Sequence, residues 1–545
     1  MKISICQLNY TVGDVEGNVA KIIDSYRRAV SDGADIAIFS ELAICGYPPQ
    51  DLLDYPHFID KCWQAMLQLA EITTDTAIIL GCPVQSDLEM GKKLFNAAVV
   101  LHQEKIVSIF AKTLLPTYNI FDEYRYFEPN SDYRLLEFKG VKIAITVCED
   151  LWDLDEPQLY KISPMKNLKA LGPDLMINIS GSPFSYLHIE NRRELMRQNA
   201  LNYDIPLFYV NQVGGNTDLI FDGGSMFINR DGVIAEELDY FSEDYKLINW
   251  QPEFGYESQS KGYKNDDITL IYNALKLGMS DYFKKSGFSK AILGLSGGLD
   301  SAVVTALTAD ALGVENVLPM LLPSKFSSDH SITDSVALCK NLELPYETLA
   351  IQEIVDSFEM LLKPLFKNMP RNVAEENIQA RTRGVLLMAI SNKLGYILLN
   401  TTNKSEAAVG YGTLYGDLCG SISVLGDVYK TQVYNLAHYI NRDKEIIPLH
   451  IISKPPSAEL SPGQKDSDSL PDYSLLDKIL HLYIEKQLGP EVICEMGFDA
   501  GVVNKVIKMV DRNEYKRFQV PPILRVSEKA FGIGRQMPLV GIINV

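Results

Sequence analysis

Short apolar runs separated by polar stretches recur along roughly the first 245 residues of the chain. The runs are rich in Ile, Val, Leu and Ala, which is the pattern of buried β-strands. Between them, the stretch from Asn18 to Asp32 has helical spacing and ends at Gly33, a residue that commonly stops a helix. This alternation predicts a layered α/β domain with a mixed sheet. The predicted strands cover residues 2–8, 34–39, 77–80, 97–101, 141–147, 175–179, 207–210 and 225–228.

The pattern breaks between residues 251 and 267, where polar and turn-forming residues replace the apolar runs. A chain of 545 residues is too long for one hydrophobic core, so we interpret this stretch as a linker between domains 1–250 and 268–545. Strands and helices alternate again in the second domain, which predicts a doubly wound parallel sheet with ligands at the carboxyl ends of its strands. Its predicted strands cover residues 291–295, 317–322, 346–350 and 397–399, with a helix at about 328–341.

Composition narrows the class of protein. The formal net charge of −19 argues against a nucleic-acid partner, which needs a basic surface. The eight cysteines include no CxxC pair, so a zinc or iron–sulfur site is not expected, and they are typical of thiols in a reducing compartment. Residues 1–6 read as a strand, and no apolar run is long enough to span a bilayer. We therefore expect a cytoplasmic protein that binds neither nucleic acid nor membrane.

A glycine-rich turn joins the predicted strand at 291–295 to a helix. Its sequence from residue 296 to 301 is Ser-Gly-Gly-Leu-Asp-Ser, so small residues leave backbone N–H groups unpaired and pointing one way. The helix N-terminus adds partial positive charge, which suits the turn to phosphate. No Gly-Lys-Ser/Thr follows, so it is not a Walker loop. The turn resembles the pyrophosphate loop of the ATP pyrophosphatases, which cleave ATP at its α-phosphate and release pyrophosphate.

Three chemically active residues of the first domain stand at the ends of apolar strands: Glu41, Lys112 and Cys148. Strand ends on one edge of a sheet meet in space, so we expect these side chains to lie together. Such a set can transfer an acyl group, with Glu41 as general base, Lys112 favouring thiolate and oxyanion, and Cys148 as nucleophile. A lone cysteine in an apolar strand is usually a buried small hydrophobe, so the prediction depends on all three.

Their order and surroundings resemble the nitrilase, or carbon–nitrogen hydrolase, family over roughly the first 245 residues. The supporting segments are 41–48, 121–127 and 178–184. The resemblance implies a domain with αββα layers and a Glu–Lys–Cys triad. It also places Glu123 where the family has a second glutamate that assists the lysine.

Some nitrilase relatives act as glutaminases inside larger synthetases, and there residues matching Tyr118 and Ser182 hold the glutamine. The family often has Lys or Arg six residues after that serine. This chain has His188 at that place, followed by Arg192 and Arg193, so which side chain meets the substrate stays open.

Segments rich in Asn, Asp, Glu, Lys and Gly follow in the second domain. Each alone could be a turn or a helix start. In their order they resemble the NAD synthetase family over roughly residues 268–545. That family adenylates the carboxylate of deamido-NAD (nicotinic acid adenine dinucleotide) and lets ammonia attack the adenylate. The segments are 376–381, 400–406, 409–417, 426–431, 454–460 and 515–522.

The resemblance to NAD synthetases implies roles for individual residues. Asp300 and Glu406 would hold Mg²⁺, which prefers hard oxygen ligands. Lys430 would offset the charge that builds on the departing pyrophosphate. The implied ATP-binding residues are Gly294, Leu295, Ser296, Gly297, Gly298, Leu299, Asp300, Ser301, Thr401 and Lys430. The implied deamido-NAD-binding residues are Asn377, Glu406, Tyr411, Gly412, Thr413, Leu414 and Lys516, with Lys404 and Arg381 as further candidates.

The two halves complement each other. Ammonia at cytoplasmic pH is mostly ammonium, which is not a nucleophile, so a synthetase gains from releasing NH₃ from glutamine beside the adenylate. Together they resemble the glutamine-dependent NAD synthetases, which implies a homo-oligomer that turns deamido-NAD, ATP and L-glutamine into NAD, AMP and pyrophosphate. Three alternatives stay open. They are an ammonia-only NAD synthetase with a non-catalytic first half, a tRNA-modifying ATP pyrophosphatase, and an amidase with an ATP-binding regulatory domain.

Overall fold

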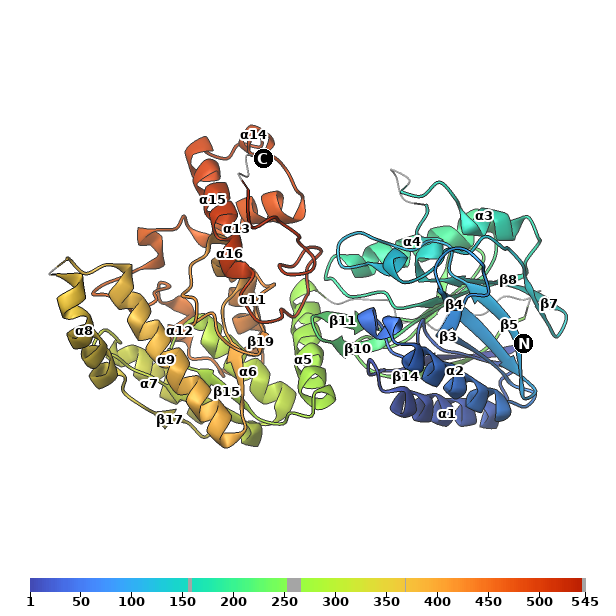
Figure 1. Cartoon of the computed structure of the whole chain (residues 1–545), viewed down its shortest axis with the longest axis horizontal. Helices are drawn as coiled ribbons and strands as arrows, with labels where there is room; N and C mark the ends of the chain where they lie inside the picture. The colour runs from blue at the N-terminus through green and yellow to red at the C-terminus, as the bar shows by residue number, and fades with distance from the viewer. Residues whose placement is uncertain (155–158, 252–265, 368, 542–545) are drawn as a thin grey trace. The chain divides into compact units, whose positions relative to one another are not determined.

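The chain divides into two compact units, Met1–Lys264 and Asn265–Val545. The computed structural model describes residues 1–154, 159–251, 266–367 and 369–541. The linker predicted at 251–267 lies almost wholly outside the described residues. Figure 1 shows that each unit has its own sheets and its own helices.

The first unit contains two mixed six-stranded sheets. In the first sheet, β1 pairs parallel with β2 and antiparallel with β14. In the second sheet, β7, β8 and β9 run parallel, so their carboxyl ends share one edge. The strand order is β14 (Asp244–Asn249), β1 (Lys2–Gln7), β2 (Ile36–Ile38), β3 (Ala77–Gln85), β4 (Leu94–His102) and β5 (Lys105–Ala111) in the first sheet. The strand order in the second sheet is β13 (Ile234–Glu237), β12 (Met226–Ile228), β9 (Leu207–Asn211), β8 (Leu175–Ser180), β7 (Val141–Val147) and β6 (Leu136–Phe138). A separate two-stranded sheet pairs β10 (Val213–Asn216) with β11 (Leu219–Asp222).

The two sheets pack face to face. Alternate residues of each strand point inward, so Ile3 and Ile5 of β1 share a buried cluster with Ile143 and Ile145 of β7. Helices α1 (Val15–Ser31) and α2 (Pro56–Glu71) cover the outer face of the first sheet. Helices α3 (Pro164–Lys169) and α4 (His188–Tyr203) cover the second. The predicted αββα layering is thus confirmed.

The second unit is built on one parallel sheet in the order β17-β16-β15-β18-β19. Counted along the chain this order is third, second, first, fourth, fifth, which is the doubly wound arrangement predicted from the sequence. The order reverses between β15 and β18, and ligands of such sheets bind outside that point. The strands are β15 (Ala291–Gly294), β16 (Val317–Leu321), β17 (Glu347–Thr348), β18 (Ile397–Asn400) and β19 (Ile422–Ser423).

Helices cover the parallel sheet, and those near the C-terminus form a cluster of their own. Val355 of α8 and Leu387 of α9 pack on Ile292 and Leu398 of the sheet. Among the described residues, no helix combines the length and the apolar character that crossing a membrane requires. The helices are α5 (Asp267–Lys285), α6 (Leu299–Leu312), α7 (Asp329–Asn341), α8 (Gln352–Phe366), α9 (Val373–Leu394), α10 (Lys404–Val409), α11 (Lys430–Ile440), α12 (Leu449–Ser453), α13 (Tyr473–Leu480), α14 (Pro490–Glu495), α15 (Ala500–Arg512) and α16 (Glu514–Arg517).

Candidate active sites

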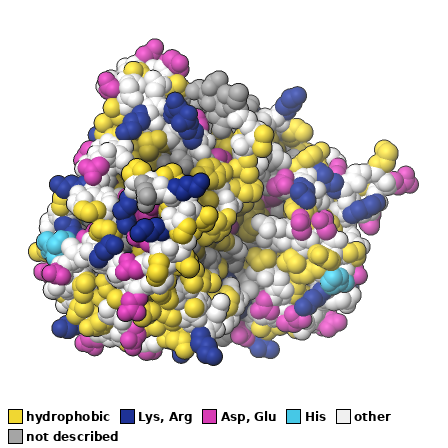
Figure 2. All heavy atoms as spheres, turned by 60° about the vertical axis from the view of Figure 1, so that its left-hand side comes forward, with side chains coloured by type: hydrophobic (Ala, Val, Ile, Leu, Met, Phe, Trp, Pro, Cys, Tyr) yellow, Lys and Arg dark blue, Asp and Glu magenta, His cyan; other side chains and the backbone are white. Residues whose placement is uncertain are grey.

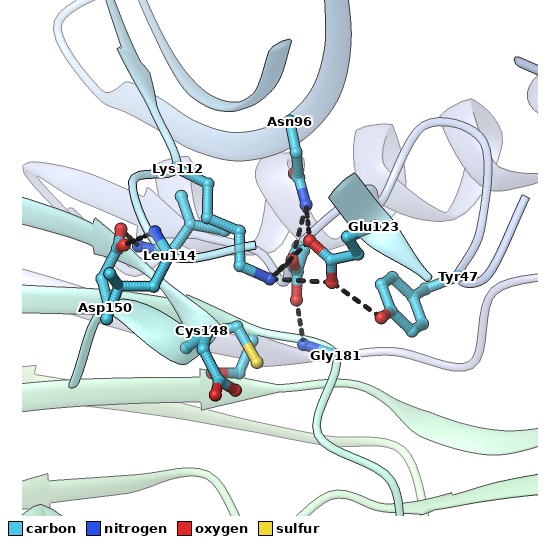
Figure 3. Close-up of polar contacts among 12 residues, drawn as sticks. Tyr47, Asn96, Lys112, Leu114, Glu123, Cys148, Asp150 and Gly181 are labelled. Carbon is cyan, nitrogen blue, oxygen red and sulfur yellow. Dashed lines mark hydrogen bonds and ion pairs between the residues drawn. The ribbon is translucent and has the colours of Figure 1, made fainter. Parts of the chain in front are cut away.

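Three predicted residues of the first unit meet at strand ends. Glu41 lies beyond β2, Lys112 follows β5, and Cys148 begins the short helix η3 (Cys148–Leu151) directly after β7. Glu41 and Lys112 are fully buried and Cys148 is 5% exposed. The charges of both act on the Cys148 thiol, and Figure 3 shows Cys148 beside the Lys112 side chain. The three residues therefore form one buried cluster.

Lys112 is held between two carboxylates. Its Nζ lies 2.8 Å from Glu41 Oε1 and 2.8 Å from both carboxylate oxygens of Glu123. The Tyr47 hydroxyl donates to Glu123 Oε1 at 2.8 Å, and Asn96 Nδ2 donates to Glu41 Oε1 at 2.7 Å and to Glu123 Oε2 at 3.3 Å (Figure 3). Every ionic group of the cluster is thus positioned before any substrate arrives.

The charge states of this cluster follow from burial and from its own charges. Burial raises the pKa of the Cys148 thiol well above its ordinary value, and the carboxylate of Glu41 raises it further. The charge of Lys112 lowers this pKa, but by less. Burial alone would lower the pKa of Lys112, but Glu123 and Glu41 bring it well above its usual value. Burial raises the pKa of Glu123 to about 7 against the opposing charge of Lys112. The resting site therefore holds a neutral thiol next to an ammonium, and the thiol needs a base.

The backbone at Cys148 is held in an unusual conformation. Its φ of 42° lies in the left-handed region, which costs a non-glycine residue on the order of 1–3 kcal/mol. The carboxylate of Asp150 spans this turn, accepting from Val147 N at 3.0 Å and from Thr113 N and Leu114 N at 2.9 Å each. Asp150 thus ties the segment after Lys112 to the turn that presents the thiol. No pattern in the sequence singled out Asp150, although it stands two residues after Cys148.

A second missed residue, Glu149, lies next to the thiol. Glu149 is 4% exposed, and its Oε1 accepts hydrogen bonds from the hydroxyls of Tyr118 at 2.8 Å and Tyr160 at 2.7 Å. Burial raises its pKa, with the two tyrosines and Lys112 opposing. Tyr118, one of the predicted glutamine-binding residues, therefore contacts this carboxylate beside Cys148.

The other two predicted glutamine-binding residues lie together. Ser182 Oγ is 3.5 Å from His188 Nε2, and the His188 ring stacks on Trp152 at 4.8 Å between centroids. Arg192 is fully buried in a two-fold hydrogen bond with Asp222, at 2.9 and 2.6 Å. Arg193 pairs with Glu237. Since both arginines are committed to carboxylates, His188 is the basic residue beside Ser182.

The second unit has a cavity of about 560 Å³ at the carboxyl ends of β15, β16 and β18. Nine of the ten predicted ATP-binding residues line it, all but Gly297. Gly297 has a φ of +76°, and a Cβ there would lie 2.4 Å from Ser331 O, so only glycine fits.

The phosphate turn is braced by its own hydroxyls. Gly298 N donates to Ser296 Oγ at 3.2 Å, and Ser296 N donates to Ser301 Oγ at 3.3 Å. Two of the N–H groups that the sequence analysis expected to be unpaired thus have partners. Both contacts are long, so an incoming phosphate oxygen can replace them.

An ion cluster lies at the mouth of this turn. Lys430, the first residue of α11, forms an ion pair with Asp300, and its Nζ is 3.8 Å from Glu406 Oε1. Asn403 Nδ2 donates to Asp300 Oδ1 at 2.9 Å. Burial lowers the pKa of Lys430, but Asp300 and Glu406 raise it by more. Burial raises the pKa of Glu406 to about 8, with Asp300 adding to the rise. Two carboxylates and one ammonium thus face the cavity together.

The predicted deamido-NAD-binding residues divide into two groups. Glu406 and Tyr411 line the cavity. The others are not among the lining residues, and they connect the loop after α10 to α9 and α16. Thr413 Oγ1 donates to Asn377 Oδ1 at 2.7 Å, and Lys516 Nζ donates to Gly412 O at 2.9 Å. Leu414 O accepts from Arg381 Nε at 3.2 Å.

Lys404 does not reach the cavity. It is fully buried, and its Nζ lies 2.7 Å from Glu485 and 2.9 Å from Asp427. Arg383, which was not among the predicted site residues, does line the cavity and donates Nε to Leu322 O at 3.0 Å. Burial lowers the pKa of Arg383 to about 10. The only sequence signal for Arg383 was its place just after the 376–381 segment.

Comparison with known proteins matches both halves of the chain. The carbon–nitrogen hydrolase family model matches residues 2–251, and the NAD synthase family model matches residues 271–521. The chain is 45% identical to the glutamine-dependent NAD(+) synthetase of Synechocystis sp., over 98% of either chain. It is 40% identical to that of Acinetobacter baylyi, over 99% of this chain and 98% of the relative. A solved structure of glutamine-dependent NAD+ synthetase from Acinetobacter baumannii in complex with ADP is similar with a TM-score of 0.79 and 37% identity, over 99% and 98% of the two chains.

Proposed function

The chain belongs to the glutamine-dependent NAD(+) synthetases, and we propose that its two sites divide the reaction of such a ligase. The Cys148 site releases ammonia from L-glutamine. The cavity beside Asp300 uses ATP to adenylate deamido-NAD, and ammonia then displaces AMP to give NAD. The observation that carries this proposal is that one chain holds both a complete buried Glu41–Lys112–Cys148 set and a phosphate turn facing a cavity.

Each residue of the first site has a task in amide cleavage. Glu41 takes the thiol proton while Cys148 Sγ attacks the side-chain carbonyl of glutamine, and the ammonium of Lys112 stabilises the oxyanion. Glu41 returns the proton to the nitrogen, the C–N bond breaks and ammonia leaves a thioester. Glu41 then activates water, which releases glutamate and restores the thiol. Glu123 keeps Lys112 cationic and in place.

Glutamine itself carries two charges that the site must hold. We assign its α-ammonium to Glu149, the buried carboxylate oriented by Tyr118 and Tyr160. Its α-carboxylate is assigned to Ser182 and His188. Both charged groups sit on the α-carbon, so holding each of them by its own partner would fix that end of glutamine and direct the side-chain amide toward the thiol.

Glu149→Gln is expected to raise the KM for glutamine about 10- to 100-fold, because a charge-assisted hydrogen bond contributes about 1.5–3 kcal/mol. NAD synthesis from ammonium should be unchanged, since the second unit is untouched. Steady-state kinetics with each nitrogen source measures both values. Glu137→Gln, an exposed glutamate on β6, is the matched control. An unchanged KM for glutamine in the Glu149 variant would refute the assignment.

In the second unit we assign the phosphates of ATP to the 296–301 turn and the N-terminus of α6. The carboxylates of Asp300 and Glu406 face the same cavity and form a hard oxygen donor set that fits Mg²⁺. When bound, Mg²⁺ would neutralise phosphate charge. Lys430 sits between these carboxylates, where its ammonium can stabilise the departing pyrophosphate.

We further propose that the active form is a homo-oligomer, in which a second copy covers α8. Ile354, Phe358, Leu361 and Leu365 recur at helical spacing along one side of α8, and the last two are 74% and 70% exposed. Val385 of α9 is 67% exposed as well. Figure 2, which brings the side of α8 forward, shows hydrophobic side chains gathered there. Patches of this kind mark self-association surfaces.

The double variant Leu361→Glu with Leu365→Glu is expected to weaken self-association on the order of 100-fold or more, because two central apolar contacts are replaced by charges. Light scattering coupled to size-exclusion chromatography measures the mass. Val492→Glu, at an exposed apolar position on α14, serves as control. The surface is wrong if the double variant keeps the mass of the parent chain.

We place the reaction in the cytoplasm. The proposed nucleophile must stay a reduced thiol to act. All eight cysteines of the chain are free, which favours a reducing compartment.

A further inference from the structure

We propose that His330, Asp334 and His450 form a binding site for a divalent transition metal of the Zn²⁺ class. One ligand atom from each of the three side chains lies within 4.8 Å of the others. The site is separate from the Asp300–Glu406 pair and does not depend on the reaction that the chain catalyses. His330 belongs to the wall of the cavity in the second unit.

Two short helices bring the three ligands together. His330 and Asp334 are four residues apart in α7 and therefore lie on one helix face, and α12, which packs on α7, carries His450. The chain has seven histidines, and two of them meet here across 120 positions with ring centroids 5.1 Å apart. Two imidazoles and one carboxylate suit Zn²⁺, Co²⁺ or Ni²⁺, whereas Mg²⁺ prefers oxygen ligands alone.

The hydrogen bonds around His330 leave a ring nitrogen available for a metal. Ser328 Oγ lies 2.8 Å from Glu459 Oε1 and 3.0 Å from His330 Nδ1. The charged carboxylate is the stronger acceptor, so we assign the serine proton to Glu459. Ser328 Oγ then accepts from Nδ1–H, and the lone pair of His330 stays on Nε2. Such a contact fixes the orientation of metal-binding histidines.

The other two ligands already share a proton that a metal can replace. His450 Nδ1 lies 2.7 Å from Asp334 Oδ2. With a metal at Nδ1, the neutral ring carries its single proton on Nε2 instead. Lys454 Nζ is 3.9 Å from Asp334 Oδ2 but 3.0 Å from Ser331 Oγ, so it keeps a partner when the metal takes Asp334. The His450 side chain is 52% exposed, which leaves water free to fill the open coordination positions.

The test is a titration of the full chain with Co²⁺ after removal of metals by a chelator. Excess Mg²⁺ is present to occupy the Asp300–Glu406 pair, and the visible absorption of Co²⁺ reports its ligands. We expect one equivalent to bind with nitrogen and oxygen ligands. His330→Ala and His450→Ala should each weaken binding at least about ten-fold, and Ser328→Ala by about ten-fold. Competition with Zn²⁺ then gives the Zn²⁺ affinity.

His438→Ala, an exposed histidine on α11, is the matched control and should bind Co²⁺ as the parent does. The removed side chains are exposed, so the fold of the His330 and His450 variants should survive, and circular dichroism checks this. The site is refuted if the parent binds no equivalent of Co²⁺. It is equally refuted if both histidine variants bind like the parent, or if the spectrum has a thiolate charge-transfer band, which would place the metal on a cysteine.

Discussion

Cys148→Ala is expected to abolish NAD synthesis from glutamine while synthesis from ammonium continues at the parent rate. The thiol is the only group of the Glu41–Lys112–Cys148 set that can form the thioester, and removing such a nucleophile costs on the order of 10⁴-fold or more. The side chain is small and lies at a strand end, so the loss of one sulfur leaves the Lys112 ion pairs intact. The measurement is NAD formation from deamido-NAD, ATP and Mg²⁺ with either nitrogen source.

Cys62→Ala is the matched control, because Cys62 is another fully buried cysteine of the first unit but lies on α2. It should keep both activities. Two outcomes would contradict the assignments in different ways. Normal use of glutamine by the Cys148 variant would mean that the first unit is not the glutaminase. A parent chain that makes no NAD from either source would overturn the ligase site.

The strands that precede Glu41 and Cys148 could be predicted because most of their residues are apolar and buried. β7 and β8 consist mostly of apolar residues and are largely buried, and the predicted bounds of β7 match Val141–Val147. The strands that escaped prediction are weaker signals. β14 is an edge strand of half-buried residues that is defined by its pairing with β1, and β10 contains two glycines. Such strands form because a neighbouring strand offers hydrogen bonds, which no local pattern reveals.

The residues of the candidate sites likewise divide into those that could be predicted from the sequence and those that could not. Glu41, Lys112 and Cys148 stand at strand ends, so topology alone brings them together. Asn96 reaches the cluster through a contact with Glu41, 55 residues away, and nothing nearby in sequence marks it. Tyr47 lies in the 41–48 segment, but its hydrogen bond to Glu123, 76 residues away, is not visible in the sequence. In the second unit the sequence motifs predicted the phosphate turn at 296–301 and the edge of the sheet where ligands bind. The 454–460 segment was also singled out by its motif, but its place in the wall of the cavity follows from tertiary packing.

Lys430→Met is expected to lower NAD synthesis from both nitrogen sources on the order of 10²- to 10³-fold, the usual effect of removing one charge that stabilises a transition state. Methionine keeps the length of the buried side chain but removes the ammonium. Asp300 and Glu406 then face each other without a cation, and the departing pyrophosphate loses its counter-charge. Formation of NAD and of pyrophosphate should fall together.

Glutamine hydrolysis separates this effect from general damage. Lys430 lies in the second unit and the Cys148 site in the first, so the Lys430 variant should still convert glutamine to glutamate. Lys478→Met, an exposed lysine on α13 of the same unit, is the control for loss of a positive charge and should keep NAD synthesis. A Lys430 variant that makes NAD at the parent rate would show that Lys430 only neutralises two buried carboxylates. A variant that has lost both activities would point to a folding defect instead, because Lys430 and the Cys148 site belong to different units. The two substitutions, Cys148→Ala and Lys430→Met, therefore predict opposite patterns, and only a chain with two separate chemical sites can give both.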